Sequence, residues 1–363
     1  MTGSRMRFRE IRGEAGRNLG TGTARATILA LLTALICTAL AALDAISMTG
    51  IITAAGTFRD RGASITILDA EHSIDGRACD RLAEQPGVRA AGALAKTDTP
   101  LTVAALPQNP LTFFTASPGF ATMLPDASGQ RTPGLLLPTD VARQLGLRIG
   151  DPIHTASGAT ALGGTYEYPD DGRPRGLGYA AIAPVSPSTR FDQCWIDAYP
   201  VSRATIELLY TAIAADATLP ESGPTLSQHN QTLGTAIEPA AVYANRMTAV
   251  FPLAGLLLGL VTGAGAVWLR RLEIASALHA GIRKTDQAST LLLETAAWAT
   301  CGALVALPMI AILTQHLDVA DHSAVVLTAV QAPTLTAAGA LLGTLLAALS
   351  IRERRLFTYF KGR

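Results

Sequence analysis

Four long stretches of the sequence are almost free of charged residues, and each is long enough to cross a lipid bilayer. A spanning helix needs about 20 mainly apolar residues, because each residue adds only about 1.5 Å along the helix axis. A single stretch of this kind could be the buried core helix of a soluble protein, but four of them in 363 residues favour a membrane protein. We predict four transmembrane helices, over residues 25–52, 247–269, 289–313 and 324–350.

The overall composition agrees with this prediction. Charged residues make up 16% of the chain, whereas soluble domains usually contain about 25%. The formal net charge of +1 gives no indication of nucleic-acid binding, and we expect none.

The distribution of lysine and arginine predicts the orientation of the chain. Fifteen of the 29 basic residues lie in or next to three short segments, with six at the N-terminal end, four in 270–288 and five in the C-terminal tail 351–363. The short loop 314–323 contains none. Positive loops stay in the cytoplasm. We therefore predict a multi-pass cell-membrane protein with both termini and 270–288 in the cytoplasm, and with residues 53–246 outside.

The first apolar stretch, 26–43, could also be a cleaved signal peptide, since basic residues precede it. It is longer than the usual apolar region of about 7–15 residues and is not followed by a clear cleavage site, so we interpret it as an uncleaved anchor. In the preceding segment, 1–24, Phe8, Ile11, Ala15 and Leu19 fall on one helical face among arginines. This pattern predicts an amphipathic helix on the cytoplasmic membrane surface; a disordered basic tail is the alternative.

Residues 53–246 have the pattern of a mixed α/β domain. Alternating or continuous apolar runs predict strands, and polar residues before apolar helical patterns predict helix caps. We expect a mobile surface loop over 157–175, where Gly, Asp and Pro are frequent, and a helix from about Pro239 that continues unbroken into the second span. The predicted strands are 64–68, 88–94 and 135–137, and the predicted helices are 74–84 after Ser73, 139–146 from Thr139, and 202–215 from Ser202.

The segment Arg270–Glu294 (RRLEIASALHAGIRKTDQASTLLLE) resembles the cytoplasmic coupling segment of the FtsX-like/MacB-type (type VII) ABC transporter permeases. A second stretch, Leu135–Asp151 (LLLPTDVARQLGLRIGD), resembles a strand–helix–turn element of the family's outer domain. The order of one span, a large domain and three spans also fits this family. The residues that the resemblance assigns to coupling with an ATPase are Arg270, Arg271, Glu273, Ile274, Ala277, Gly281, Lys284 and Glu294.

The resemblance implies an α-helical membrane protein with a MacB-like extracytoplasmic domain inserted between spans 1 and 2. It implies a permease subunit that pairs with a second copy of itself or a related permease, contacts membrane lipids, and transmits motion from a cytoplasmic ABC ATPase. The implied cargo is a peptide, a lipid-linked molecule or another amphipathic compound. The alternative is an FtsX-like signalling subunit that controls a cell-wall hydrolase or an envelope-stress response.

The sequence lacks the motifs of several enzyme classes. It has no GxxxxGK(S/T) loop for nucleotide phosphates, no Gly-x-Ser-x-Gly and no His-Glu-x-x-His. We therefore expect a non-catalytic chain without a cofactor of its own, with ATP and Mg²⁺ bound by the partner ATPase. Two histidines and two aspartates in 314–323 could ligate a metal, but a solvated loop would have the same composition, so we expect no metal site.

Two features of the apolar stretches suggest specific contacts. Glu294 either links the coupling segment to the helix bundle or extends to the membrane surface, because a buried acid in a membrane is usually paired. Glycines 255, 259 and 263 recur every four residues and predict close helix packing, which we assign to the first span of a partner protomer; general small-residue richness is the alternative.

The chain has four cysteines, and Cys79 and Cys194 both fall in the predicted outer domain. In an oxidising compartment they could form a disulfide. Two separate buried thiols are the alternative, because no spacing rule forces the pair together.

Overall fold

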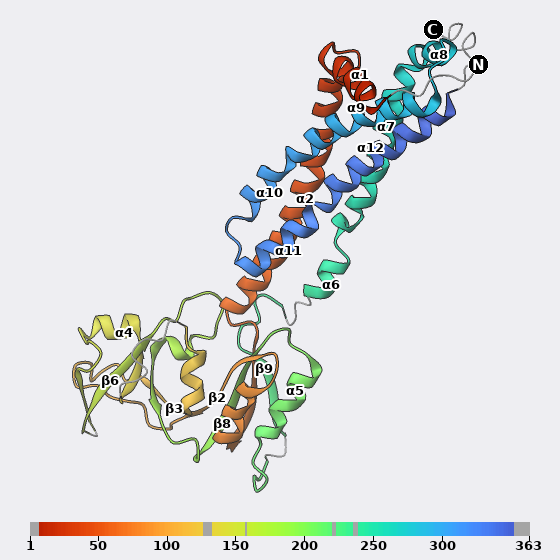
Figure 1. Cartoon of the computed structure of the whole chain (residues 1–363). Helices are drawn as coiled ribbons and strands as arrows, with labels where there is room; N and C mark the ends of the chain where they lie inside the picture. Colours follow the sequence, from red (N-terminus) through yellow and green to blue (C-terminus); the bar gives the residue numbers. More distant parts are fainter. Residues whose placement is uncertain (1–6, 126–132, 157, 220–222, 235–238, 352–363) are drawn as a thin grey trace. The chain divides into compact units, whose positions relative to one another are not determined.

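The computed structural model describes residues 7–125, 133–156, 158–219, 223–234 and 239–351 (Figure 1). The chain divides into two compact units. The helical unit comprises the described residues up to Thr53 and from Ala240 onward, and the sheet domain comprises those from Ala54 to Pro239. Helix α2 (Ala26–Asp60) begins in the first unit, and its last turns belong to the second.

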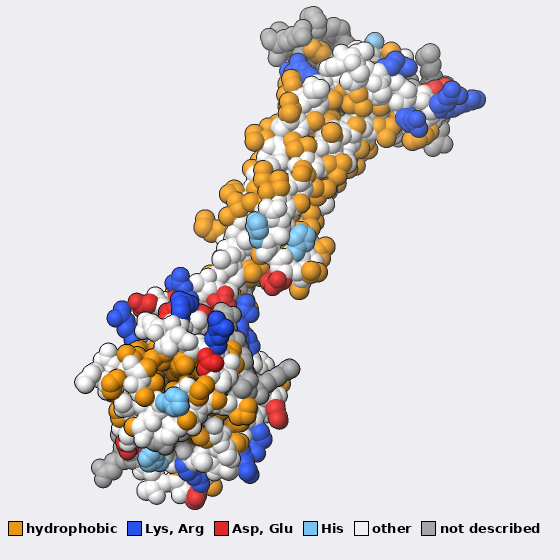
Figure 2. Space-filling view, turned by 90° about the vertical axis from the view of Figure 1, so that its left-hand side faces the viewer, with side chains coloured by type: hydrophobic (Ala, Val, Ile, Leu, Met, Phe, Trp, Pro, Cys, Tyr) orange, Lys and Arg blue, Asp and Glu red, His pale blue; other side chains and the backbone are white. Residues whose placement is uncertain are grey.

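Within the described residues, the helical unit contains four helical stretches that are long and apolar enough to cross a membrane. Figure 2 shows that hydrophobic side chains cover much of its surface. The stretches are α2; Pro239–Leu269, with α6 (Pro239–Ala244), the 3₁₀ turn η5 (Met247–Val250) and α7 (Phe251–Leu269); Lys284–Thr314, with α9 (Lys284–Leu304) and α10 (Ala306–Thr314); and Val319–Ser350, with α11 (Val319–Ala329) and α12 (Gln331–Ser350). Two shorter helices complete the unit, α1 (Phe8–Gly20) and α8 (Arg271–His279).

The boundaries of these helices differ from the expected spans in ways that proline explains. The helix from Pro239 is not continuous, because α6 ends at Ala244 and α7 starts afresh with Pro252 in its first turn, where a missing N–H costs nothing. Helix α9 ends at Leu304, four residues before Pro308, and α11 ends at Ala329, four residues before Pro333. A proline ring clashes with the carbonyl four residues earlier. Helix α2, in contrast, runs to Asp60, beyond the expected end at residue 52.

In the sheet domain, the described strands form one mixed nine-stranded sheet in the order β5-β6-β4-β7-β3-β2-β8-β1-β9. Strand β8 pairs antiparallel with β1 and β2, whereas β3 pairs parallel with β7, and β4 with β6. The strands are β1 (Ile65–Asp75), β2 (Val88–Lys96), β3 (Thr112–Ala116), β4 (Leu135–Pro138), β5 (Pro152–Thr155), β6 (Gly158–Tyr166), β7 (Ala180–Pro184), β8 (Arg190–Ala198) and β9 (Thr225–Gln228). The helices are α3 (Gly76–Arg81), α4 (Thr139–Gln144) and α5 (Arg203–Leu209), with 3₁₀ turns η1 (Leu82–Glu84), η2 (Pro118–Met123), η3 (Arg175–Tyr179) and η4 (Tyr210–Ala212).

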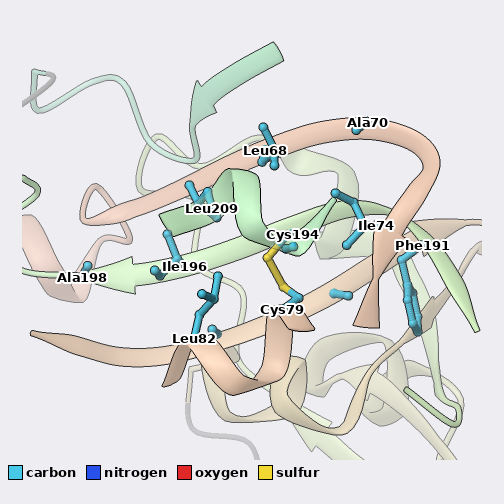
Figure 3. Packing of buried hydrophobic residues seen from close by; sticks show 13 residues of the cluster. Leu68, Ala70, Ile74, Cys79, Leu82, Phe191, Cys194, Ile196, Ala198 and Leu209 are labelled. Carbon is cyan, nitrogen blue, oxygen red and sulfur yellow. A yellow bond between two sulfur atoms is a disulfide. The ribbon is translucent and has the colours of Figure 1, made fainter. Parts of the chain in front are cut away.

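The two faces of the central strands bury different side chains, because successive residues of a strand point to opposite faces. On one face, Cys194 and Ile196 of β8 pack with residues of α3 and α5 (Figure 3). A disulfide joins Cys194 to Cys79 of α3 within this cluster. On the other face, Trp195 packs with Leu94 of β2 and with Phe120 of η2.

Several expectations for this domain are wrong. Part of the expected loop 157–175 is strand β6, in which Leu162 and Tyr166 are fully buried. The frequent glycines predicted a loop, but the segment forms a strand because it pairs with β4, which is distant in the sequence. Ser73 does not cap a helix, because β1 continues to Asp75, and the Asp75 carboxylate accepts the hydrogen bond from the Ala78 N–H instead (3.0 Å).

The other two expected caps differ from each other. Ser202 caps α5 as expected, accepting from the Thr205 N–H at 3.1 Å, but the α-helix ends at Leu209 rather than Ala215. Thr139 lies inside the first turn of α4, and its hydroxyl donates to the Tyr166 carbonyl rather than capping the helix.

Candidate functional site

Helix α8 is a short amphipathic helix that follows α7 almost without interruption. Ile274, Ala275 and Leu278 are buried in a cluster with residues of α7, α9 and α12. The opposite side of α8 carries Glu273 and His279, which are exposed. The helix is therefore fixed to the helical unit by one face, and its other face is exposed.

Arg270, at the junction of α7 and α8, holds this helix by ionic contacts. Its Nε and Nη2 donate to the two carboxylate oxygens of Glu273 at 3.0 and 2.9 Å, and its Nη1 donates to Oε2 of Glu294 in α9 at 2.5 Å. The side chains of Arg270 and Glu294 are only 10% and 4% exposed. A buried charge is costly unless it is paired and hydrogen-bonded, so these contacts determine where the two side chains lie.

The second oxygen of Glu294 binds a third segment of the chain. Oε1 accepts a hydrogen bond from Nδ2 of Asn18 in α1 at 2.7 Å. Glu294 therefore does not extend to solvent, and its two oxygens join α1 and the α7–α8 junction to α9. We call the four residues Asn18, Arg270, Glu273 and Glu294 the junction network.

The other residues that the resemblance assigned to coupling lie in α8, in the turn after it and at the start of α9. Arg271 and Ala277 are half-buried, and Lys284 is exposed at the start of α9. Gly281 adopts a φ of +98°, and the N–H of Ile282 returns to the carbonyl of Ala277 at 3.2 Å. Glycine favours this left-handed conformation after a helix, so Gly281 turns the chain from α8 into α9.

The sequence missed Asn18, because only tertiary packing brings it to Glu294. It also missed a second buried pair, in which Nε of Arg246 lies 3.3 Å from Oδ1 of Asp44 and the side chains are 9% and 3% exposed. Asp44 follows the first apolar stretch and Arg246 precedes the second. Opposite charges at the facing ends of two spans were a signal that could have indicated this pair.

The close packing of the three glycines is present, but its partner is not the one expected. A Cβ added at Gly255 would lie 2.6 Å from Oγ1 of Thr336, and one at Gly259 or Gly263 would collide with the backbone of α12. Gly339 and Gly343 of α12 face the backbone of α7 in the same way. The glycine face therefore packs against α12 of the same chain, because two complementary small-residue faces allow these backbones to approach closely.

No cluster of three His, Cys, Asp or Glu side chains that could hold a metal ion occurs among the described residues. The expected loop 314–323 is shorter than predicted, because α10 ends at Thr314 and α11 begins at Val319.

No protein-family model matches the chain, and no curated protein matches it. Among solved structures, the periplasmic region of MacB from Actinobacillus actinomycetemcomitans is similar, with 9% sequence identity and a TM-score of 0.33. The match covers 47% of this chain and 92% of that one. A likeness at this level does not assign the chain to a family.

Proposed function

We propose that this protein is the membrane subunit of an ABC transporter of the FtsX-like/MacB type. In this proposal a separate cytoplasmic ATPase binds the exposed face of α8, and its motion reaches the sheet domain through the helical unit. The observation that carries the proposal is the junction network, in which Arg270 and Glu294 connect this exposed helix to α9 and α1.

The network suits a coupling role because it resists independent movement of α8. Moving α8 away from α9 would separate Arg270 from Glu294 and leave a buried carboxylate with one partner fewer. Breaking a buried ion pair typically costs about 3–5 kcal/mol. A force on α8 is therefore transmitted to α9 and α1 more readily than it is absorbed at the junction.

The other parts of the proposal follow from the sequence. The basic segments support a cytoplasmic position for α8 and both termini, with the sheet domain on the outer side. A second permease copy completes the membrane part, and ATP and Mg²⁺ belong to the ATPase. The cargo is a peptide, a lipid-linked molecule or another amphipathic compound that is moved on the outer side of the membrane.

Site-specific crosslinking tests the ATPase contact. In a Cys301→Ser background, which removes the exposed free thiol, His279→Cys should crosslink to a co-expressed ATPase subunit, identified by mass spectrometry. Val319→Cys is the matched control, because Val319 is 89% exposed but belongs to the opposite side of the membrane in this proposal. Crosslinks from Phe8→Cys in α1 but not from His279→Cys would contradict the assignment of α8.

A further inference from the structure

The sheet domain contains a cavity of about 320 Å³ on the face opposite the disulfide. Ile67, Leu94 and Trp195 of the central strands form one side, and Phe114, Tyr168 and His229 complete much of the lining. Ligand sites are typically concave, mainly apolar and about 300–1,000 Å³ in volume. The volume of this cavity falls within that range, and its lining is mainly apolar and aromatic.

Most polar side-chain atoms in the walls are already paired with other protein atoms; the exception is Nδ1 of His229, which is buried and has no hydrogen-bond partner. Nε1 of Trp195 donates to Oε1 of Gln193 at 2.9 Å, and Nε2 of Gln193 donates to Asp69 at 2.6 Å. The Tyr168 hydroxyl donates to the Pro174 carbonyl at 2.6 Å. A polar group placed in the cavity would exchange its bonds to water for few new ones, which disfavours its burial. The buried part of a ligand should therefore be apolar.

The charged residues at the cavity differ in their state of pairing. Asp192 accepts hydrogen bonds from the backbone N–H groups of His72 and Lys96 at 3.1 and 3.0 Å, and its Oδ1 lies 2.8 Å from Nδ1 of His72. The ammonium group of Lys96 has no hydrogen-bond or ion-pair partner among the described residues, and Lys96 is exposed. The charged group at the cavity that has no partner among the described residues is therefore the Lys96 ammonium group.

We propose that this cavity binds a small apolar anion, with an aromatic or alkyl body against Trp195 and Phe114 and an anionic group at Lys96. The carboxylate or sulfonate would form a charge-assisted hydrogen bond with the ammonium group, and the ring would stack on the aromatic walls. This inference goes beyond the proposed function and needs no ATPase, although such a ligand would belong to the amphipathic class proposed as cargo.

Binding is tested with two probes that share a ring but carry opposite charges, 2-naphthoate and 2-naphthylmethylammonium. The full chain is placed in lipid nanodiscs, and Trp268→Phe and Trp298→Phe leave Trp195 as the sole tryptophan of the three. We expect a saturable change in Trp195 fluorescence with 2-naphthoate and at least tenfold weaker binding of the cation, after subtraction of empty nanodiscs. Equilibrium dialysis of both probes against the wild-type chain gives a second measurement that needs no tryptophan variant.

Two variants separate the charge from the cavity. Lys96→Gln should reduce the preference for the anion to near onefold, whereas Arg77→Gln, at an exposed basic residue of α3 that does not line the cavity, should leave it unchanged. Gly176 lines the cavity, and a Cβ added there meets nothing within 4 Å, so Gly176→Phe should fill the space and reduce binding at least tenfold without unfolding the domain. Equal binding of both probes, or unchanged binding in Gly176→Phe, would overturn the proposal. Either failure would leave the crosslinking test of the ATPase contact unaffected.

Discussion

The helical unit and the sheet domain are each stabilised internally by a different kind of contact. In the helical unit, large apolar side chains such as Leu31 and Val261 are exposed at 71% and 66%, and the specific contacts are the glycine face and two buried ion pairs. In the sheet domain, large apolar side chains such as Leu68, Phe191 and Ile182 are fully buried, and a disulfide links a helix to a central strand.

This difference reflects the two solvents that we propose for the chain. In lipid, burying a leucine against another helix gains little, because lipid tails are as apolar as the side chain, so close backbone packing and polar contacts provide specificity. In water, burial of apolar area is the main driving force. The same chain therefore uses its small and charged residues for assembly in one unit and its large apolar residues in the other.

Loss of the disulfide is expected to have the largest effect, and only on the sheet domain. Cys79 and Cys194 are 115 residues apart, and closing a loop of this size stabilises a fold by about 4–5 kcal/mol in the chain-entropy model. Cys79→Ala with Cys194→Ala should lower hydrogen-exchange protection in β1, β2 and β8 by this amount. The exposed Cys301→Ser is the control and should change nothing. Equal loss of hydrogen-exchange protection in α7 and α12 would show that the disulfide does not stabilise the sheet domain alone.

Disrupting the glycine face should have the next largest effect, and only on the helical unit. Gly259→Leu places a side chain against the backbone of α12, and overpacking of this kind typically costs about 1–3 kcal/mol; we expect about 3 kcal/mol because a backbone cannot move aside like a side chain. Unfolding of the detergent-solubilised chain by SDS measures this loss of stability. Gly265→Leu in the same helix is the matched control, since a Cβ there meets nothing within 4 Å. Equal destabilisation by both variants would contradict the role of this face.

The junction network should contribute less to stability and more to coupling. Glu294→Gln removes the buried charge opposite Arg270 but leaves Arg270 paired with Glu273, so we expect a loss of about 2 kcal/mol in the SDS assay. Glu273→Gln is the comparison, because Glu273 is half exposed and its loss should cost about 1 kcal/mol or less. Where the ATPase is bound, Glu294→Gln should also reduce the response of ATP hydrolysis to the permease. If ATP hydrolysis responds normally to the Glu294→Gln permease, the Arg270–Glu294 pair has no role in coupling.

Mild acid should destabilise only the sheet domain, by the smallest amount. Burial lowers the pKa of His229 to about 4, with a further lowering by Arg173 and an opposing effect of Asp171. An unfolded histidine has a pKa near 6.5, so below that value the unfolded state binds the proton more readily and stability falls as the pH approaches 4. Between pH 7 and 5.5 we expect a loss of about 1 kcal/mol. Hydrogen exchange of β1 and β9 measures this loss of stability. His229→Phe should remove the dependence of stability on pH in this range. If stability falls with pH as before in that variant, other groups cause the dependence.

The local patterns of the sequence predicted much of this molecule. Four apolar stretches correspond to the four long helical stretches, because the absence of charge over about 20 residues is a property of the chain itself. The start of α5 at Ser202 was also predictable, since a cap acts within three residues. The breaks before Pro308 and Pro333 were readable by the same local rule, although we did not expect them.

What only the tertiary structure decided are the contacts between segments far apart in the sequence. The bond from Asn18 to Glu294 spans 276 positions, and the disulfide was one of two open alternatives. Strand β6 and the partner of the glycine face were assigned wrongly. A residue's own neighbours determine whether it can be helical, buried or capped, but a partner is selected by which distant surface fits it. That choice depends on the packing of the whole unit, which no local pattern contains.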